Sequence, residues 1–168
     1  MIEMLSASHL AIVCFSGLLC WALVSDALTF KIPNRIPIAI AALYPVWVMT
    51  NSPALDRLWI PIVIAAGVLA AGFVAFSLRL IGGGDAKLLA AVSLWAGPEW
   101  LVPLLLVTTL TGGLLAVAIM VAALARRRMA VGGGEELAPL IGAIAKSKLP
   151  YGIAIAAGGL FVAAGLWT

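Results

Sequence analysis

Long hydrophobic stretches alternate with short polar breaks along almost the whole chain. Each break is rich in proline, glycine or charged residues, which favour turns and end regular structure. The length of the stretches is typical of helices that cross a membrane. The pattern predicts six segments, at residues 8–25, 36–50, 58–80, 86–97, 100–125 and 149–167.

The composition indicates that these segments lie in a membrane. Of 168 residues, 64% are hydrophobic and only 10% are charged, with a mean hydropathy of +1.19. Soluble domains carry about 25% charged residues, so a soluble protein is excluded. Since one crossing needs about 20 apolar residues, the chain has room for about six transmembrane helices and no separate soluble domain. We therefore expect an all-α, polytopic membrane protein with a single domain over residues 1–168.

Two of the segments differ from an ordinary membrane-crossing helix. Segment 86–97 is too short to cross alone as a straight helix, so we expect it to be covered by protein or to line a wet cavity. The first segment carries Glu3 and His9 in place of a basic start, and no small-residue cleavage site follows it. We therefore interpret it as a retained helix and not as a signal peptide.

Basic residues predict the orientation. With six crossings, every lysine and arginine except Arg57 falls on one side of the membrane. These are Lys31, Arg35, Arg79, Lys87, Arg126, Arg127, Arg128, Lys146 and Lys148. The positive-inside rule makes that side cytoplasmic and places both termini outside the cytoplasm.

Asp26 and Asp85 are the main candidates for chemistry. The six-segment arrangement places both at the cytoplasmic ends of apolar segments, where an unpaired charge is costly, by at least about 2.5 kcal/mol at mid-bilayer. Two carboxylates brought together can share a proton near neutral pH. One can then deprotonate a water while the other donates to a peptide carbonyl, as in aspartic proteases.

A purely structural reading of Asp85 is also open. The stretch "GGGDAKLL" fits an aspartate at the start of a helix, where it caps the backbone or meets the helix dipole. Gly82, Gly83 and Gly84 just before it are expected to let the backbone take conformations closed to other residues and approach a substrate strand without a Cβ in the way.

Three motifs together resemble the type IV prepilin peptidases, membrane aspartic proteases with a GxGD motif. They are "SDALTFKIPNRI", "GGGDAKLLAA" and "LPYGIAIAAGGL". The resemblance implies a bacterial inner-membrane endopeptidase that removes the leaders of prepilins and pseudopilins at the cytoplasmic face. It implies Asp26 and Asp85 as the catalytic pair, with Gly82 and Gly84 at the two glycine positions of GxGD.

The chain departs from the larger members of that family. They carry an N-terminal insertion with CxxC motifs, linked to methylation of the new pilin terminus. Here the only cysteines, Cys14 and Cys20, lie inside the first segment and cannot form such a site. We expect them to be small packing residues, and the chain resembles the short peptidases of tight-adherence (Flp) pilus systems.

Other polar residues are expected to shape the site or to anchor the helices. Pro33 and Asn34 are expected to form the turn before the second helix. Lys87 lies about 200° around a helix from Asp85, so we expect it not to point the same way as the carboxylate. It either reaches the cytoplasmic interface, or steadies the site or meets an acidic residue of the substrate. The six tryptophans lie mainly near segment ends, as in an interfacial belt.

Some alternatives remain open. Asp26 and Asp85 could instead relay protons or bind a cation in a small transporter or channel subunit. Glu135 and Glu136 form a rival acidic pair, which we interpret as part of a solvated loop. The run of three arginines at 126–128 suggests a membrane anchor and not nucleic-acid binding. We expect prepilin substrates and lipid as partners, with no metal and no cofactor, and the sequence leaves homo-oligomers open.

Overall fold

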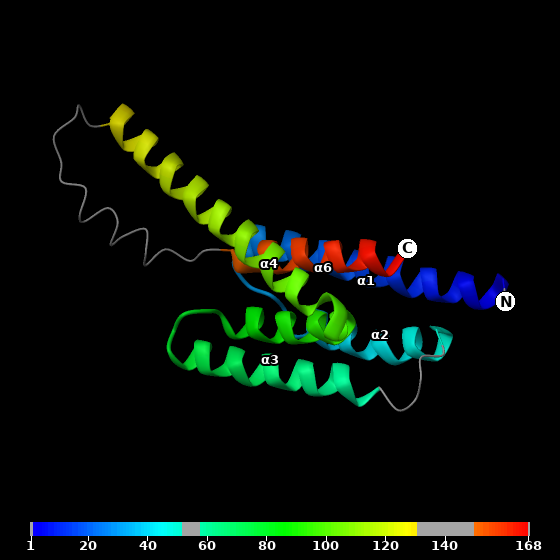
Figure 1. Ribbon diagram of the computed structural model, residues 1–168. Coiled ribbons are helices and arrows are strands. Elements are labelled where there is room, and N and C mark those ends of the chain that lie inside the picture. Colours follow the sequence, from blue (N-terminus) through cyan, green and yellow to red (C-terminus); the bar gives the residue numbers. More distant parts are fainter. Residues whose placement is uncertain (1, 52–57, 131–149, 168) are drawn as a thin grey trace.

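The computed structural model describes residues 2–51, 58–130 and 150–167. Every regular element in these residues is a helix, and no strand occurs among them. The helices are α1 (Ile2–Thr29), α2 (Arg35–Asn51), α3 (Trp59–Ser77), α4 (Gly83–Ala130) and α6 (Tyr151–Trp167) (Figure 1). The predicted all-α fold is confirmed for the described part.

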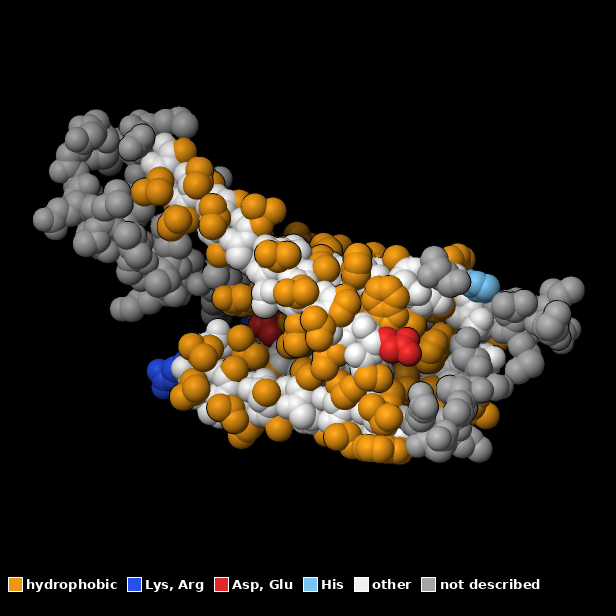
Figure 2. Space-filling view, viewed as in Figure 1, with side chains coloured by type: hydrophobic (Ala, Val, Ile, Leu, Met, Phe, Trp, Pro, Cys, Tyr) orange, Lys and Arg blue, Asp and Glu red, His pale blue; other side chains and the backbone are white. Residues whose placement is uncertain are grey.

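The helices have the composition of a membrane protein. Three of them contain stretches long and apolar enough to cross a bilayer: Ala7–Thr29, Trp59–Ser77 and Gly83–Ala125. Shorter apolar helices run over Arg35–Thr50 and Tyr151–Trp167. Figure 2 shows hydrophobic side chains over most of one face, with few charged groups among them. The chain is therefore a membrane protein, while the count of about six crossings stays a prediction.

Helix α4 is broken at Gly97, which has the non-helical angles φ 55° and ψ −163°. Only glycine adopts such angles at little cost, and Pro98 after it has no N–H to continue the helix. The chain turns back there, so that residues 83–96 run beside α3 and residues 98–130 pass α6 (Figure 1). The break falls at the boundary predicted between segments 86–97 and 100–125.

The alternation of helix directions separates two ends of the molecule. The N- and C-termini lie at the same end, and the connections at residues 30–34 and 78–82 lie at the other (Figure 1). This arrangement agrees with the predicted placing of Lys31, Arg35 and Arg79 on one side. Several other residues of that prediction lie outside the part whose side chains are described: Arg57, the arginines at 126–128, Lys146 and Lys148.

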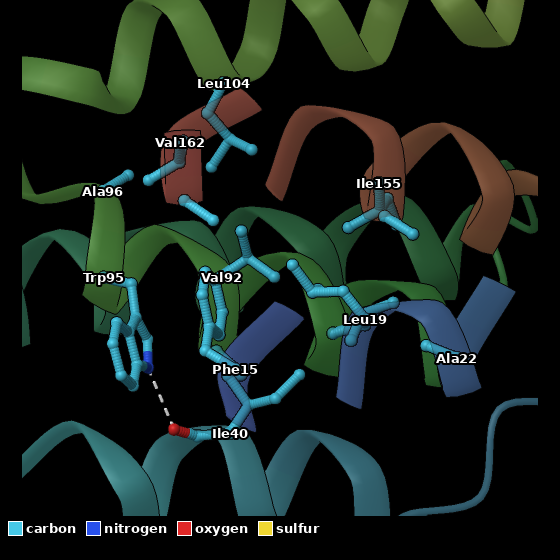
Figure 3. Close-up of a cluster of buried hydrophobic side chains, with 14 of the residues drawn as sticks. Phe15, Leu19, Ala22, Ile40, Val92, Trp95, Ala96, Leu104, Ile155 and Val162 are labelled. Carbon is cyan, nitrogen blue, oxygen red and sulfur yellow. Dashed lines mark hydrogen bonds between the residues drawn. The ribbon is translucent and has the colours of Figure 1, made fainter. Parts of the chain in front are cut away.

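The core forms where α1, α2, α4 and α6 meet (Figure 3). Trp95 lies in this core and is only 2% exposed. Its ring stacks on that of Phe15, with ring centroids 4.3 Å apart. Its Nε1–H donates to the backbone oxygen of Ile40 at 2.9 Å. Its assignment to an interfacial belt is therefore wrong. Nearness to the end of a segment does not show which way a side chain points, and this indole is turned inward.

Candidate functional site

Asp26 occupies the last turn of α1 and is 4% exposed. Its Oδ2 accepts the backbone N–H of Gly152 at 2.7 Å, in the first turn of α6. The free N–H groups and positive dipole end of a helix N-terminus stabilise a negative charge. A Cβ at Gly152 would lie 2.8 Å from the Asp26 carboxyl carbon, so only glycine lets this helix end approach so closely.

Asp85 lies in the first turn of α4 and is half-buried. Its Oδ2 accepts the N–H of Gly82 at 3.1 Å, three residues earlier. A side chain of the first turn that reaches back to the residue before the helix forms one half of a capping box. The helix-start interpretation of Asp85 is thus correct, and it leaves a chemical role open because the carboxylate also faces a cavity.

Asp26 and Asp85 line the same cavity, of about 1120 Å³. Its walls come from the connections at 29–34 and 79–84, from the end of α1, and from Tyr151 at the start of α6. The two carboxylates are close enough for their charges to interact. The fold therefore brings together two acidic groups that are far apart in the sequence, in a space large enough to admit a peptide segment.

The three glycines before Asp85 also line this cavity. None of them has a positive φ, so the expectation of unusual backbone angles is wrong. The predicted close approach to a substrate strand stays a prediction, and the structure shows a different close approach, within the chain itself. A Cβ at Gly82 would lie 2.6 Å from Asp85 Oδ2, and one at Gly84 would lie 3.2 Å from the Cβ of Ile32. Gly83 is less restricted, since its nearest contact is the Phe76 ring at 3.4 Å.

Pro33 and Asn34 form the predicted turn into α2. The N–H of Ile36 bonds to the Pro33 oxygen at 3.0 Å, and Asn34 and Pro33 both line the cavity. Lys87 donates to Asn34 Oδ1 at 3.0 Å. It therefore ties the start of α4 to the connection between α1 and α2, and it does not line the cavity with the two aspartates.

Two non-glycine residues with left-handed backbone angles flank the site: Phe30 with φ 52° and Arg79 with φ 60°. Phe30 directly follows α1, and Arg79 follows the C-cap residue of α3, positions where such angles close the last turn of a helix. After α3 the closing bond runs from Leu80 N–H to the Ala75 oxygen at 2.9 Å. Both residues line the cavity, so both helix ends turn sharply at the cavity that the two aspartates line.

The residue-level interpretation of the sequence missed Gly152, Tyr151 and Arg79 as parts of the site. The motif "LPYG" was a signal for the first two, but nothing in their local sequence indicates which helix they meet. Cys14 and Cys20 are free thiols exposed on α1, so the expectation that they pack inside is wrong. The described residues contain no group of three or more His, Cys, Asp or Glu side chains that could hold a metal. Glu135 and Glu136 lie outside the described residues.

The fold and the cavity define a helical membrane protein with an acidic site at one end. A model of the type IV leader peptidase family matches residues 13–117, and the chain belongs to that family. The match covers Asp26, Asn34, the glycines at 82–84 and Asp85, and it indicates a protease. Comparisons with curated proteins and with solved structures find no match.

Proposed function

We propose that the protein is an aspartic endopeptidase that removes the leader peptides of type IV, Flp-like prepilins and pseudopilins. The observation that supports this proposal is that Asp26 and Asp85 line the same cavity. The chain that contains them belongs to a leader peptidase family. The family supplies the class of reaction. The cavity supplies two carboxylates and space for the peptide bond.

The reaction needs one ionised and one protonated carboxyl group. The ionised group takes a proton from a water, whose oxygen attacks the carbonyl carbon of the scissile bond. The protonated group donates its proton to the carbonyl oxygen, which gives a tetrahedral diol. Collapse of the diol breaks the C–N bond, and the proton taken from the water passes to the leaving amine. The carboxyl group that gave its proton to the carbonyl oxygen regains one from a hydroxyl of the collapsing diol, so both carboxyl groups return to their starting states.

Backbone N–H groups would hold both carboxylates in position for these steps. Asp26 is bonded to Gly152 and Asp85 to Gly82, and each bond fixes one oxygen of its carboxylate. Because backbone donors move less than side chains, the two groups keep their orientation as protons move between them. This rigidity is the property that acid–base catalysis requires of its groups.

The site is proposed to face the cytoplasm of a bacterial inner membrane. Lys31 and Arg79 line the same cavity as the aspartates, and Arg35 begins the next helix. Basic residues at one end of a helical bundle favour the cytoplasmic side. A leader peptide that has not crossed the membrane would reach the carboxylates from that side.

The test is leader cleavage by the purified protein acting on a candidate prepilin. Asp26→Asn and Asp85→Asn should each lower the rate by about 10²-fold or more, because an amide can neither take nor give the proton. Glu99→Gln is the matched control: Glu99 is exposed, lies beside the Gly97 break and lines no part of the cavity, so it should keep wild-type activity. Retention of most activity by either aspartate variant, with normal membrane insertion, would exclude the pair.

A further inference from the structure

A second cavity, of about 400 Å³, lies between α2 and α3 above the first part of α4. Helices α2 and α3 both pack against α4 and scarcely against one another, which leaves a groove between them. Ile38 and Ala41 form the α2 wall, Ala66 and Leu69 form the α3 wall, and Ala91 belongs to the floor. We call this cavity the α2–α3 groove.

The α2–α3 groove has the surface of a helix-packing site. Small residues in a membrane protein allow another helix backbone to approach closely, and alanines occur on both walls and on the floor. Ile38 and Leu69 at the rims are 65% and 45% exposed, so they are free to cover the sides of a bound segment. Helix α3 itself is held by a similar close contact, because a Cβ at Gly72 would lie 2.9 Å from the Cβ of Ala86.

One end of the groove is polar and leads to the candidate active site. Lys87 and Asn34 stand there, joined by their 3.0 Å hydrogen bond. Asn34 lines both the groove and the larger cavity that holds Asp26 and Asp85. From Lys87 the groove runs along α4 to Leu94, a rise of about 10 Å, with apolar lining beyond its polar end.

We infer that the α2–α3 groove binds the apolar helix of the substrate, immediately after the bond that is cut. The inference rests on the proposed function. A prepilin of the proposed class is polar in its leader and apolar after the cleavage site. The two cavities follow the same order, from the polar space around the carboxylates, past Asn34, into the apolar groove. Because Asn34 lines both cavities, a segment lying in the groove would have its polar end beside the cavity of the carboxylates.

Kinetics on two substrates test this inference. Ala66→Phe should fill the groove and lower kcat/KM for the full-length prepilin by about tenfold, the effect of losing about 1.4 kcal/mol of binding. The fall should be much smaller for a short peptide that spans the cleavage site and lacks the apolar helix. Ala71→Phe is the matched control, since Ala71 is exposed on α3 and does not line the groove. Equal kcat/KM of Ala66→Phe and Ala71→Phe on the full-length prepilin would overturn the inference.

Photo-crosslinking gives an answer that is independent of turnover. A photoreactive phenylalanine derivative at position 66 in the Asp85→Asn background should crosslink to the apolar segment of the prepilin. The same group at position 71 should not. Crosslinks from position 66 to lipid alone, or to a second copy of this chain, would assign the groove to that other occupant and overturn the inference. These results are separable from the proposed function, which fails only if the wild type cuts no prepilin or an aspartate variant stays active.

Discussion

Gly152 is the residue on which the position of the Asp26 carboxylate depends most directly. Its N–H donates to Asp26 at 2.7 Å, and its hydrogen atoms occupy the place where any other side chain would meet that carboxylate. Gly152 therefore has two roles: its N–H donates a hydrogen bond, and its lack of a side chain leaves room for the carboxylate. A substitution that keeps the N–H and removes the space separates the two.

Gly152→Ala makes that separation. The added methyl group would lie 2.8 Å from the Asp26 carboxyl carbon and must displace it or tilt α6. We expect prepilin cleavage to fall about a hundredfold, the usual effect of a misplacement near 1 Å at a reacting group. Gly17→Ala is the control, because a Cβ at Gly17 meets nothing within 4 Å. If Gly152→Ala cleaves as fast as Gly17→Ala, the contact does not position the carboxylate.

The three glycines before Asp85 should differ from one another. Gly82→Val and Gly84→Val should each cut turnover severely, because their Cβ atoms would meet Asp85 Oδ2 and Ile32 respectively. Gly83→Ala should be milder, since its Cβ would touch only the edge of the Phe76 ring. Initial cleavage rates in detergent measure the order. A Gly83→Ala variant more damaged than Gly84→Val would refute the steric explanation.

At the scale of elements, the break in α4 decides which helix faces which. Residues 83–96 carry Asp85 and pack beside α2 and α3, while residues 100–112 pack on α6. Without the reversal at Gly97, α4 would continue away from the core, and α6 would lose the surface that brings Gly152 to Asp26. The backbone angles of one glycine therefore hold the two halves of the site together.

Gly97→Ala tests this role of the break. A Cβ is strongly disfavoured at φ 55° and ψ −163°, so the substitution should destabilise the fold by about 1–3 kcal/mol. Thermal unfolding in detergent should show a lower Tm than the wild type. Gly113→Ala is the control, because Gly113 also lies in α4 and a Cβ there meets nothing within 4 Å. This variant should leave Tm unchanged or slightly raised. An unchanged Tm for Gly97→Ala would mean that the break is not fixed by this residue.

At the scale of the whole molecule, the two ends of the bundle have different functions in the proposal. The end with residues 30–34 and 78–82 holds the cavity and its basic residues, and the opposite end holds both termini. Leader cleavage before export requires the first end to face the cytoplasm. The proposed function therefore predicts the orientation of the protein in the membrane.

Cysteine labelling tests the orientation in a background where Cys14 and Cys20 are replaced. A cysteine at Lys31 or at positions 126–148 should be labelled only after the membrane is made permeable. A cysteine at Glu99 or at positions 51–57 should be labelled from outside by an impermeant reagent. The opposite pattern would put the cavity on the wrong face for the proposed reaction.

Much of this molecule follows from local sequence. Hydrophobic length predicted the helices, the Gly-Pro pair at 97–98 predicted the boundary inside α4, and Pro33 with Asn34 predicted the turn into α2. These features depend on residues within a few positions of one another, so a linear pattern contains the information.

Only the tertiary structure decided which faces of the helices meet. Helices such as α3 and α6 are apolar all round, so they have no polar stripe from which an inward face could be predicted. For that reason the sequence alone did not indicate the burial of Trp95, the bond from Gly152 to Asp26 or the α2–α3 groove. The glycines at 82–84 illustrate the same limit. Their number predicted a special position, and only the packing of Ile32 and Asp85 around them gave the reason, which is closeness and not backbone angle.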